Sequence, residues 1–236
     1  FGQEYHSYLE QAKMWFNLAQ QQEHPESLYE YGMMLANGND KSMTAMGQGC
    51  VARSAGMGYA DAQVQLGRYL RYGSNNFDVD LPDALHNFTQ AAQLDHPIAL
   101  AELAEMYANG LGTPLDEQKA FECAVRSAEA SYPQGQFYLA ECYLTGMGVS
   151  VDEAIAFEWL AKSAEQFHPE AMFELAEAIT SGRTLEFSIQ DAKRYLNLCF
   201  HVPALQNRAK LSYAKYLLKF EPGIDGMIVA ASMFQE

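Results

Sequence analysis

The sequence predicts an all-α fold, a solenoid of about five repeats, each of which is a hairpin of two helices. A nineteen-residue phrase, LAEMYANGLGTPLDEQKAF at 103–121, returns as LAECYLTGMGVSVDEAIAF at 139–157. The same anchor position recurs 34 to 37 residues apart, at Tyr31, Leu66, Leu103, Leu139, Leu175 and, in a degenerate copy, Ala209. A fixed period in this range is typical of stacked helical repeats, in which each repeat buries its apolar face against its neighbours.

The anchor lies in the first helix of each repeat. In residues 134–145, Leu139 and Tyr143 recur at helical spacing and predict a buried stripe. Small residues beside the anchor, such as Ala140, allow a neighbouring helix to approach closely. Seven residues after the anchor a glycine recurs, and glycine commonly ends a helix at a positive φ. These glycines are Gly38, Gly73, Gly110, Gly146 and Gly182.

The second helix follows a loop. Asp80, Asp116, Asp152 and Ser188 share one position, where each can cap a helix start by accepting from free backbone N–H groups. A short turn, often with proline, then starts the next repeat. The copy at 42–58 carries four glycines, each of which costs up to about 1 kcal/mol in a helix. We therefore expect a frayed or mobile element there.

The recurring pattern A-x-x-x-L-[GA]-x-x-Y-x-x-G-x-G-x-x-x-D-x-x-x-A-[FW] resembles the Sel1-like repeat, a relative of the tetratricopeptide repeat. The resemblance covers roughly residues 8–216 and implies a right-handed α/α superhelical solenoid. We expect a single array over residues 1–236. Its parts are the second helix of a partial repeat at 5–24, repeats at about 25–59, 60–96, 97–132, 133–168 and 169–202, and a degenerate closing repeat at 203–236.

Composition excludes several kinds of partner. The chain has 15 Lys and Arg against 30 Asp and Glu, a net charge of −15, which disfavours nucleic acid. Its apolar runs are shorter than the roughly 20 residues of a membrane span, so we expect no direct membrane insertion. A basic protein surface is the natural complement, although such a charge can equally serve solubility. An export signal would be absent from a chain that begins at Phe1, so the compartment, bacterial periplasm or cytoplasm, stays open.

The residues that often carry chemistry form no reactive pattern. His24, His96, His168 and His201 recur in the turns between repeats, roughly 36 or 72 residues apart. Ligands of one metal ion must converge, so we expect turn residues there and no metal site. The stretch DVDLPD at 78–83 is expected to be a cap and a solvated loop. With no phosphate-binding loop and no nucleophile motif, we expect no catalytic residue and no cofactor.

The four cysteines leave two alternatives open. Cys123 and Cys142 lie equally far from the turn at 132–133, so a disulfide between them is conceivable in a helical hairpin. Cys50 and Cys199 have no partner at a matching position. All four can instead be buried thiols that pack like small apolar groups.

The resemblance implies that the first helices line the concave face of the array. The positions two before and two after each anchor then form two rows in a groove, with three glutamates in the second row. Arg71 is added from the position five residues after the anchor Leu66. The partner-binding residues expected there are Tyr29, Met33, Arg68, Arg71, Glu105, Phe137, Glu141, Phe173 and Glu177. Aromatic side chains supply contact area, and carboxylates select cationic partners. A surface glutamate is also ordinary, and Phe137 and Phe173 can equally fill space between repeats.

We therefore expect a protein-binding scaffold or adaptor, not an enzyme, whose acidic, aromatic-lined groove holds a basic region of a partner protein. The resemblance implies two alternatives. One is an immunity-type inhibitor that neutralises a secreted bacterial toxin, since some Sel1-like proteins resemble immunity factors. The other is a β-lactamase-like hydrolase of the cysteine-rich Sel1-like branch, whose regular cysteine spacing this chain lacks.

Overall fold

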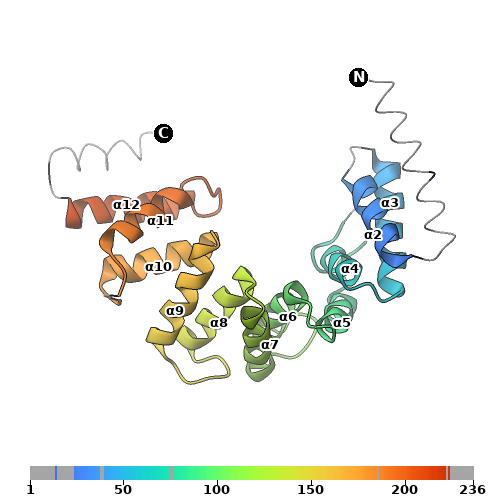
Figure 1. Cartoon of the computed structure of the whole chain (residues 1–236), viewed down its shortest axis with the longest axis horizontal. Coiled ribbons are helices and arrows are strands. Elements are labelled where there is room, and N and C mark those ends of the chain that lie inside the picture. Colours follow the sequence, from blue (N-terminus) through green and yellow to red (C-terminus); the bar gives the residue numbers. More distant parts are fainter. Residues whose placement is uncertain are drawn as a thin grey trace. The chain divides into compact units, whose positions relative to one another are not determined.

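The computed structural model describes residues 14, 24–37, 40–74, 77–184, 186–221 and 223 (Figure 1). Over these residues every named element is a helix, and the β pairing is limited to an isolated bridge between Ser74 and Phe77. The predicted all-α solenoid is confirmed for this part of the chain. The helices are α2 (Pro25–Ala36), α3 (Lys41–Gly56), α4 (Ala60–Tyr72), α5 (Leu81–Ala92), α6 (Pro97–Asn109), α7 (Glu117–Glu129), α8 (Pro133–Thr145), α9 (Glu153–Glu165), α10 (Pro169–Ser181), α11 (Ile189–Cys199) and α12 (Gln206–Phe220).

The chain divides into two compact units, Phe1–Cys123 and Ala124–Glu236. In the first unit, helices α2 to α6 pack on one another in sequence order. In the second unit, helices α8 to α12 do the same, and α12 also contacts α10. Adjacent hairpins therefore build each core. The expected single array and its repeat bounds stay a prediction, and most of the partial repeat at 5–24 lies outside the described residues.

The predicted helix caps are confirmed. The Asp80, Asp116 and Asp152 carboxylates accept hydrogen bonds from the backbone N–H three residues on, at 3.0, 3.0 and 3.1 Å. Ser188 forms a reciprocal capping box with Asp191. Such a cap stabilises a helix by about 1 kcal/mol, so one residue type at one position of each repeat fixes where the second helix begins.

The recurring glycines end the first helices as predicted. Gly73, Gly110, Gly146 and Gly182 have φ values of 75°, 65°, 81° and 82°. In this left-handed region a Cβ meets the backbone, which explains why glycine recurs there. Gly38, the corresponding residue of the first repeat, lies outside the described residues.

The expectation of a frayed element at 42–58 is wrong. Helix α3 is continuous over sixteen residues and begins at Asp40, whose carboxylate accepts from the backbone N–H groups of Ser42 and Met43. One of its glycines, Gly47, packs against Gly32 of α2, where an added methyl group on Gly32 would lie 2.8 Å from the Gly47 carbonyl oxygen. The close contact of two backbones compensates for the low helix propensity of this glycine.

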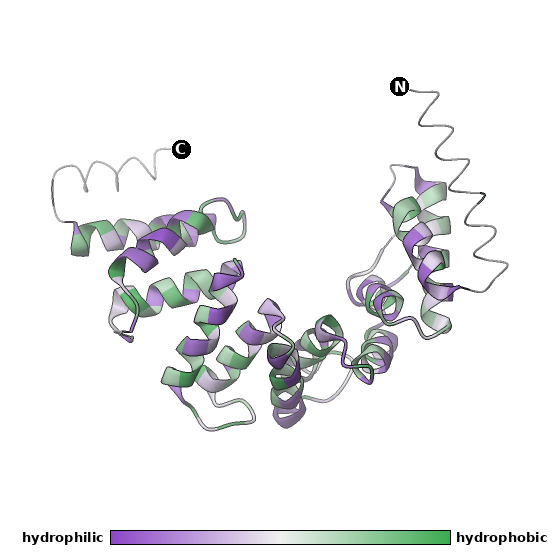
Figure 2. Ribbon diagram, in the orientation of Figure 1, coloured by the Kyte–Doolittle hydropathy of each residue, from purple (hydrophilic) through white to green (hydrophobic). Residues whose placement is uncertain are grey.

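Each unit buries an apolar stripe from every helix, and Figure 2 shows apolar and polar residues side by side along the same helices. Phe88, Leu100 and Met106 are fully buried in the first unit, as are Leu160 and Leu175 in the second. Burying such a side chain contributes roughly 1.5–3 kcal/mol.

A buried hydroxyl or thiol ties the second helix of several hairpins to the start of the first helix. Ser54 Oγ donates to the Pro25 carbonyl oxygen at 2.6 Å, and Ser163 Oγ donates to that of Pro133 at 2.7 Å. Cys199 Sγ approaches the Pro169 carbonyl oxygen at 3.6 Å in the same relation. These contacts fix how the two helices of a hairpin pack.

Candidate partner-binding site

The row two positions before the anchor is largely buried. Val64, Ala101, Phe137 and Phe173 are exposed by only 4, 2, 8 and 3%. The Phe137 ring stacks on His168 at 5.1 Å between centroids. Phe137 and Phe173 therefore fill space against the following repeat and do not stand free in a groove. Their sequence positions had left both alternatives open.

In the first unit, two residues of the expected partner-binding set, Tyr29 and Met33, lie on α2 and are partly buried. The Tyr29 ring lies 5.4 Å from the ring of Tyr59, and Met33 Sδ lies 4.0 Å from the Tyr69 hydroxyl. Burial, with the charge of Asp61, raises the pKa of Tyr59 to about 12. These side chains form an aromatic cluster on α2 and α4 that exposes only part of each residue.

Arg71 is buried in an ion-pair network between α4 and α6. Its guanidinium lies 2.6 Å from Glu102 and 2.7 Å from Glu105, and Arg68 Nε lies 2.7 Å from the other Glu102 oxygen. Burial alone would lower the pKa of Arg71, but hydrogen bonding and the charge of Glu105 outweigh it, so the pKa is raised. Arg71, 7% exposed, cannot meet a partner directly, and Glu105 is committed to it.

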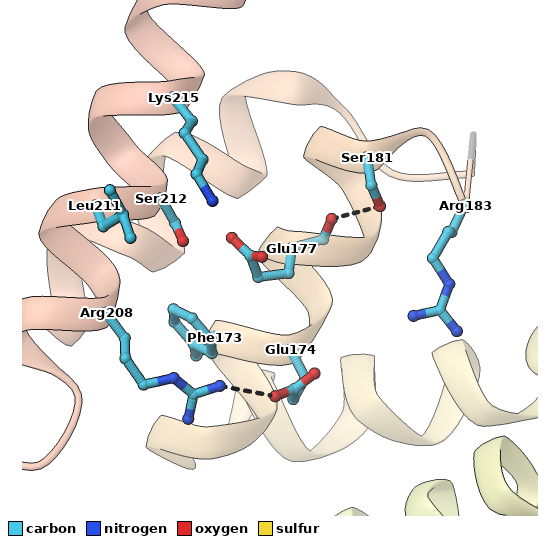
Figure 3. A pocket seen from close by; sticks show the side chains of 9 residues that line it. All are labelled: Phe173, Glu174, Glu177, Ser181, Arg183, Arg208, Leu211, Ser212 and Lys215. Carbon is cyan, nitrogen blue, oxygen red and sulfur yellow. Dashed lines mark hydrogen bonds and ion pairs between the residues drawn. The ribbon is translucent and has the colours of Figure 1, made fainter.

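In the second unit, a groove of about 360 Å³ opens between α10 and α12 (Figure 3). Two residues of the expected set, Phe173 and Glu177, line it, and the rest of its wall comes from residues that the sequence did not single out. The α10–α12 groove is lined by Phe173, Glu174, Glu177, Ser181, Arg183, Arg208, Leu211, Ser212 and Lys215. The buried Phe173 still contributes its ring to this lining.

The charges of the groove are divided between its walls. Helix α10 supplies Glu174 and Glu177, and α12 supplies Arg208 and Lys215. A third cation of the lining, Arg183, follows α10 and pairs with Glu153 of α9 at 2.6 Å. The Arg208 guanidinium lies 4.4 Å from the Phe173 ring centroid and 3.6 Å from Glu174. Figure 3 shows Lys215 and Glu177 directed toward one another. Neither forms an ion pair of 4 Å or less among the described residues, so both charges remain available to a ligand.

A family model described as the Sel1 repeat matches residues 25–43, 60–96, 97–132 and 133–166, more than half of the chain. The chain belongs to the Sel1 repeat family. Among proteins of curated function, none matches it significantly in sequence. A Sel1 repeat scaffold suggests protein–protein interaction, and solenoids of this family are generally non-catalytic.

Several solved structures share the Sel1 repeat fold. A protective antigen of uropathogenic Escherichia coli strains that displays an SLR fold is 21% identical, with a TM-score of 0.73, over 93% of this chain and 47% of that chain. This chain therefore spans about half the length of that relative. A Sel1 repeat protein from Oxalobacter formigenes is 19% identical, with a TM-score of 0.72, over 91 and 88%. An immunity protein from Pseudomonas aeruginosa is 15% identical, with a TM-score of 0.54, over 89 and 80%.

Three of the four turn histidines of this Sel1 repeat protein form caps or turn contacts. His24 Nδ1 and His168 Nδ1 accept from the backbone N–H groups of Ser27 and Ala171, at 3.4 and 3.3 Å. His96 Nε2 lies 3.1 Å from Asp61. Among the described residues, no group of three or more His, Cys, Asp or Glu could hold a metal ion, and no helix is long and apolar enough to cross a membrane.

All four cysteines lie in the described part of the chain, and each is a thiol in the structure. Burial raises the pKa values of Cys142 and Cys199 to about 11. A thiol with a raised pKa is a poor nucleophile, so these two residues act as packing groups.

The basic wall of the groove was missed because it belongs to the degenerate closing copy of the Sel1 repeat. Leu211 stands two residues after the anchor Ala209, the position that Glu177 holds in the preceding copy. Extending the row by one repeat would have found Leu211 and, one turn to either side, Arg208 and Lys215. Nothing in the sequence indicated the role of Glu102. This residue directly precedes the anchor Leu103, outside the two rows, and it is only 9% exposed in the structure.

Proposed function

We propose that this Sel1 repeat protein is a protein-binding scaffold that holds a basic region of a partner protein against the carboxylates of its first helices. One observation carries the proposal. The Glu177 carboxylate lines an open groove without an ion pair among the described residues, in a chain of net charge −15. Lys215 is directed toward this carboxylate across the groove but does not pair with it, so Glu177 can accept from a cationic side chain of a ligand.

The geometry supports binding over chemistry. Glu141 on α8 and Glu177 on α10 occupy the same position in successive first helices, and both are partly exposed. Carboxylates one repeat apart, about 10 Å, are too distant to share a proton, whereas they can contact successive residues of an extended ligand. The net charge would also accelerate the encounter with a basic partner.

Immunity-type inhibition is a second candidate function. It is favoured by the similarity in fold to an immunity protein from Pseudomonas aeruginosa, and an acidic inhibitor would suit a toxin with a basic active site. Stoichiometric neutralisation of a co-purifying secreted toxin is the expected result for an inhibitor. A partner that keeps its activity in the complex is the expected result for an adaptor.

The experiment for the scaffold uses the partner captured from the source organism, purified and titrated against the full chain. Reversing Glu141 and Glu177 to lysine should lower affinity by about tenfold or more, mainly through the association rate. The matched control reverses Glu158 and Glu165, exposed residues of the second helix α9, and changes the net charge equally. An equal loss from both pairs would mean that only the net charge matters, and it would refute binding at the first helices.

A further inference from the structure

Helix α12 differs in charge from the rest of the chain. It carries Arg208, Lys210, Lys215 and Lys219 and no acidic residue, whereas the whole chain has twice as many acidic as basic residues. Four of the fifteen cations therefore lie in one helix of fifteen residues. A partner that is only basic would be repelled by this positive helix, so it does not explain why the cations are concentrated there.

The exposed residues of α12 form one stripe that includes the groove wall. Arg208, Leu211, Lys215 and Leu218 follow one another at helical spacing, and the two leucines are 48 and 56% exposed. Leu211 faces the groove together with Phe173 (Figure 3). The exposed apolar surface of the groove is therefore chiefly Leu211, with the largely buried Phe173 beside it. It is flanked by the carboxylates of α10 and by the cations of α12, while Arg183 is paired with Glu153.

We propose that the α10–α12 groove binds a short amphipathic helix of the partner, whose apolar ridge is flanked by basic residues on one side and acidic residues on the other. This rests on the proposed function and deepens it, because it specifies the chemistry of the bound segment. On α10 the lining runs from Phe173 to Ser181, about 12 Å of helix, which matches two turns of a ligand helix.

Each feature of the groove selects one feature of that ligand. An apolar side chain enters beside Phe173 and Leu211, a cationic side chain meets Glu177, and a carboxylate meets Lys215. The existing pair between Arg208 and Glu174 spans 3.6 Å between side chains that are 61 and 42% exposed, so ligand charges can replace it readily. A purely basic helix would instead place like charges against Arg208 and Lys215, which opposes binding.

The test uses three synthetic helical peptides with the same leucine ridge and different flanks, namely lysine on both sides, glutamate on both sides, or lysine on one side and glutamate on the other. Binding to the full chain is measured by fluorescence anisotropy near 0.15 M salt, where long-range attraction is screened. The mixed peptide should bind about fivefold or more tightly than the all-lysine peptide, in spite of the net charge of −15.

Two double variants test the position of the site. With Arg208→Glu and Lys215→Glu, the all-lysine peptide should become the tightest ligand. The control, Lys162→Glu with Arg194→Glu, changes the net charge equally at exposed residues of α9 and α11, and it should keep the native order. All four side chains are exposed, so folding is expected to persist, and the order on the native chain is decisive if a variant fails to fold.

The other possible orders of peptide affinity refute either the mixed flank, the basic partner or the groove as a helix-binding site. If the all-lysine peptide binds the native chain as tightly as the mixed one or more tightly, the mixed flank is refuted and the proposed basic partner stands. If the all-glutamate peptide binds most tightly, both are refuted. If none binds, the α10–α12 groove is not a site for such a helix, whereas the affinity of the captured partner still decides the scaffold.

Discussion

Gly47 of α3 faces Gly32 of α2 across a contact that has no room for a side chain. A methyl group added to Gly47 would lie 2.4 Å from the Gly32 carbonyl oxygen. Because the obstacle is backbone, we expect Gly47→Ala to lower the free energy of unfolding by roughly 1–3 kcal/mol. Urea unfolding followed by circular dichroism measures this change.

Gly49, in the same helix, supplies the matched control. An added methyl group there meets nothing within 4 Å, so Gly49→Ala should raise the free energy of unfolding by up to about 1 kcal/mol through helix propensity. If both variants were equally stabilising, the close approach of α2 and α3 would be refuted.

The buried hydroxyl of Ser163 is predicted to hold the hairpin of α8 and α9 together. Ser163 is fully buried, and Ser163→Ala would leave the Pro133 carbonyl oxygen without this hydrogen bond. We expect a loss of roughly 1–3 kcal/mol in the free energy of unfolding. Cys199 holds the equivalent position at 3.6 Å, so Cys199→Ser should preserve stability. A larger loss from Cys199→Ser than from Ser163→Ala would contradict this interpretation.

Removing Arg71 is predicted to destabilise the fold because it leaves the carboxylates of Glu102 and Glu105 without this cation. Arg71→Met leaves Glu102, 9% exposed, with only the partly exposed Arg68, and we expect a loss of roughly 3–5 kcal/mol in stability. The double variant Arg71→Met with Glu102→Met should recover most of it, since no buried charge remains. A double-mutant cycle measured by urea unfolding tests this. Small, additive losses would show that the network contributes little.

His168 is predicted to make stability depend on pH. Its burial lowers the pKa of the imidazole, against the opposing charge of Glu170, and Nδ1 must stay unprotonated to accept from Ala171. The unfolded chain, with a pKa near 6.5, binds more protons, so stability falls as the pH drops from about 6.5 toward the lower folded pKa. His168→Asn keeps an acceptor at the cap and does not titrate. Its unfolding free energy should therefore decline less between about pH 8 and pH 5, and equal declines would refute the role of His168.

The parts of this fold that could be predicted are those that each repeat needs. Asp152 caps α9 and Gly146 ends α8 because every hairpin requires an acceptor at one point and a positive φ at another. The period identifies equivalent positions, and the backbone gives them equivalent roles. The frayed element at 42–58 was predicted wrongly because Gly47 was judged by helix propensity alone, without the Gly32 contact.

The candidate site could be predicted only in part. A period does not tell how far a helix is rotated, so Phe137 was expected in a groove although it packs against His168. The pairing of Arg71 with Glu102 joins variable positions of different repeats, which no repeat pattern encodes. The basic wall at Arg208 and Lys215 lies in the copy whose pattern is weakest.

Site-specific photo-crosslinking can establish whether a partner lies in the groove between α10 and α12. A photoreactive amino acid is placed at Leu211, 48% exposed in the groove, or at Val151, 59% exposed in the loop before α9. We expect efficient cross-linking of the captured partner from position 211 and little from position 151. Cross-linking from position 151 that equals or exceeds that from position 211 would show that the partner does not lie in the α10–α12 groove.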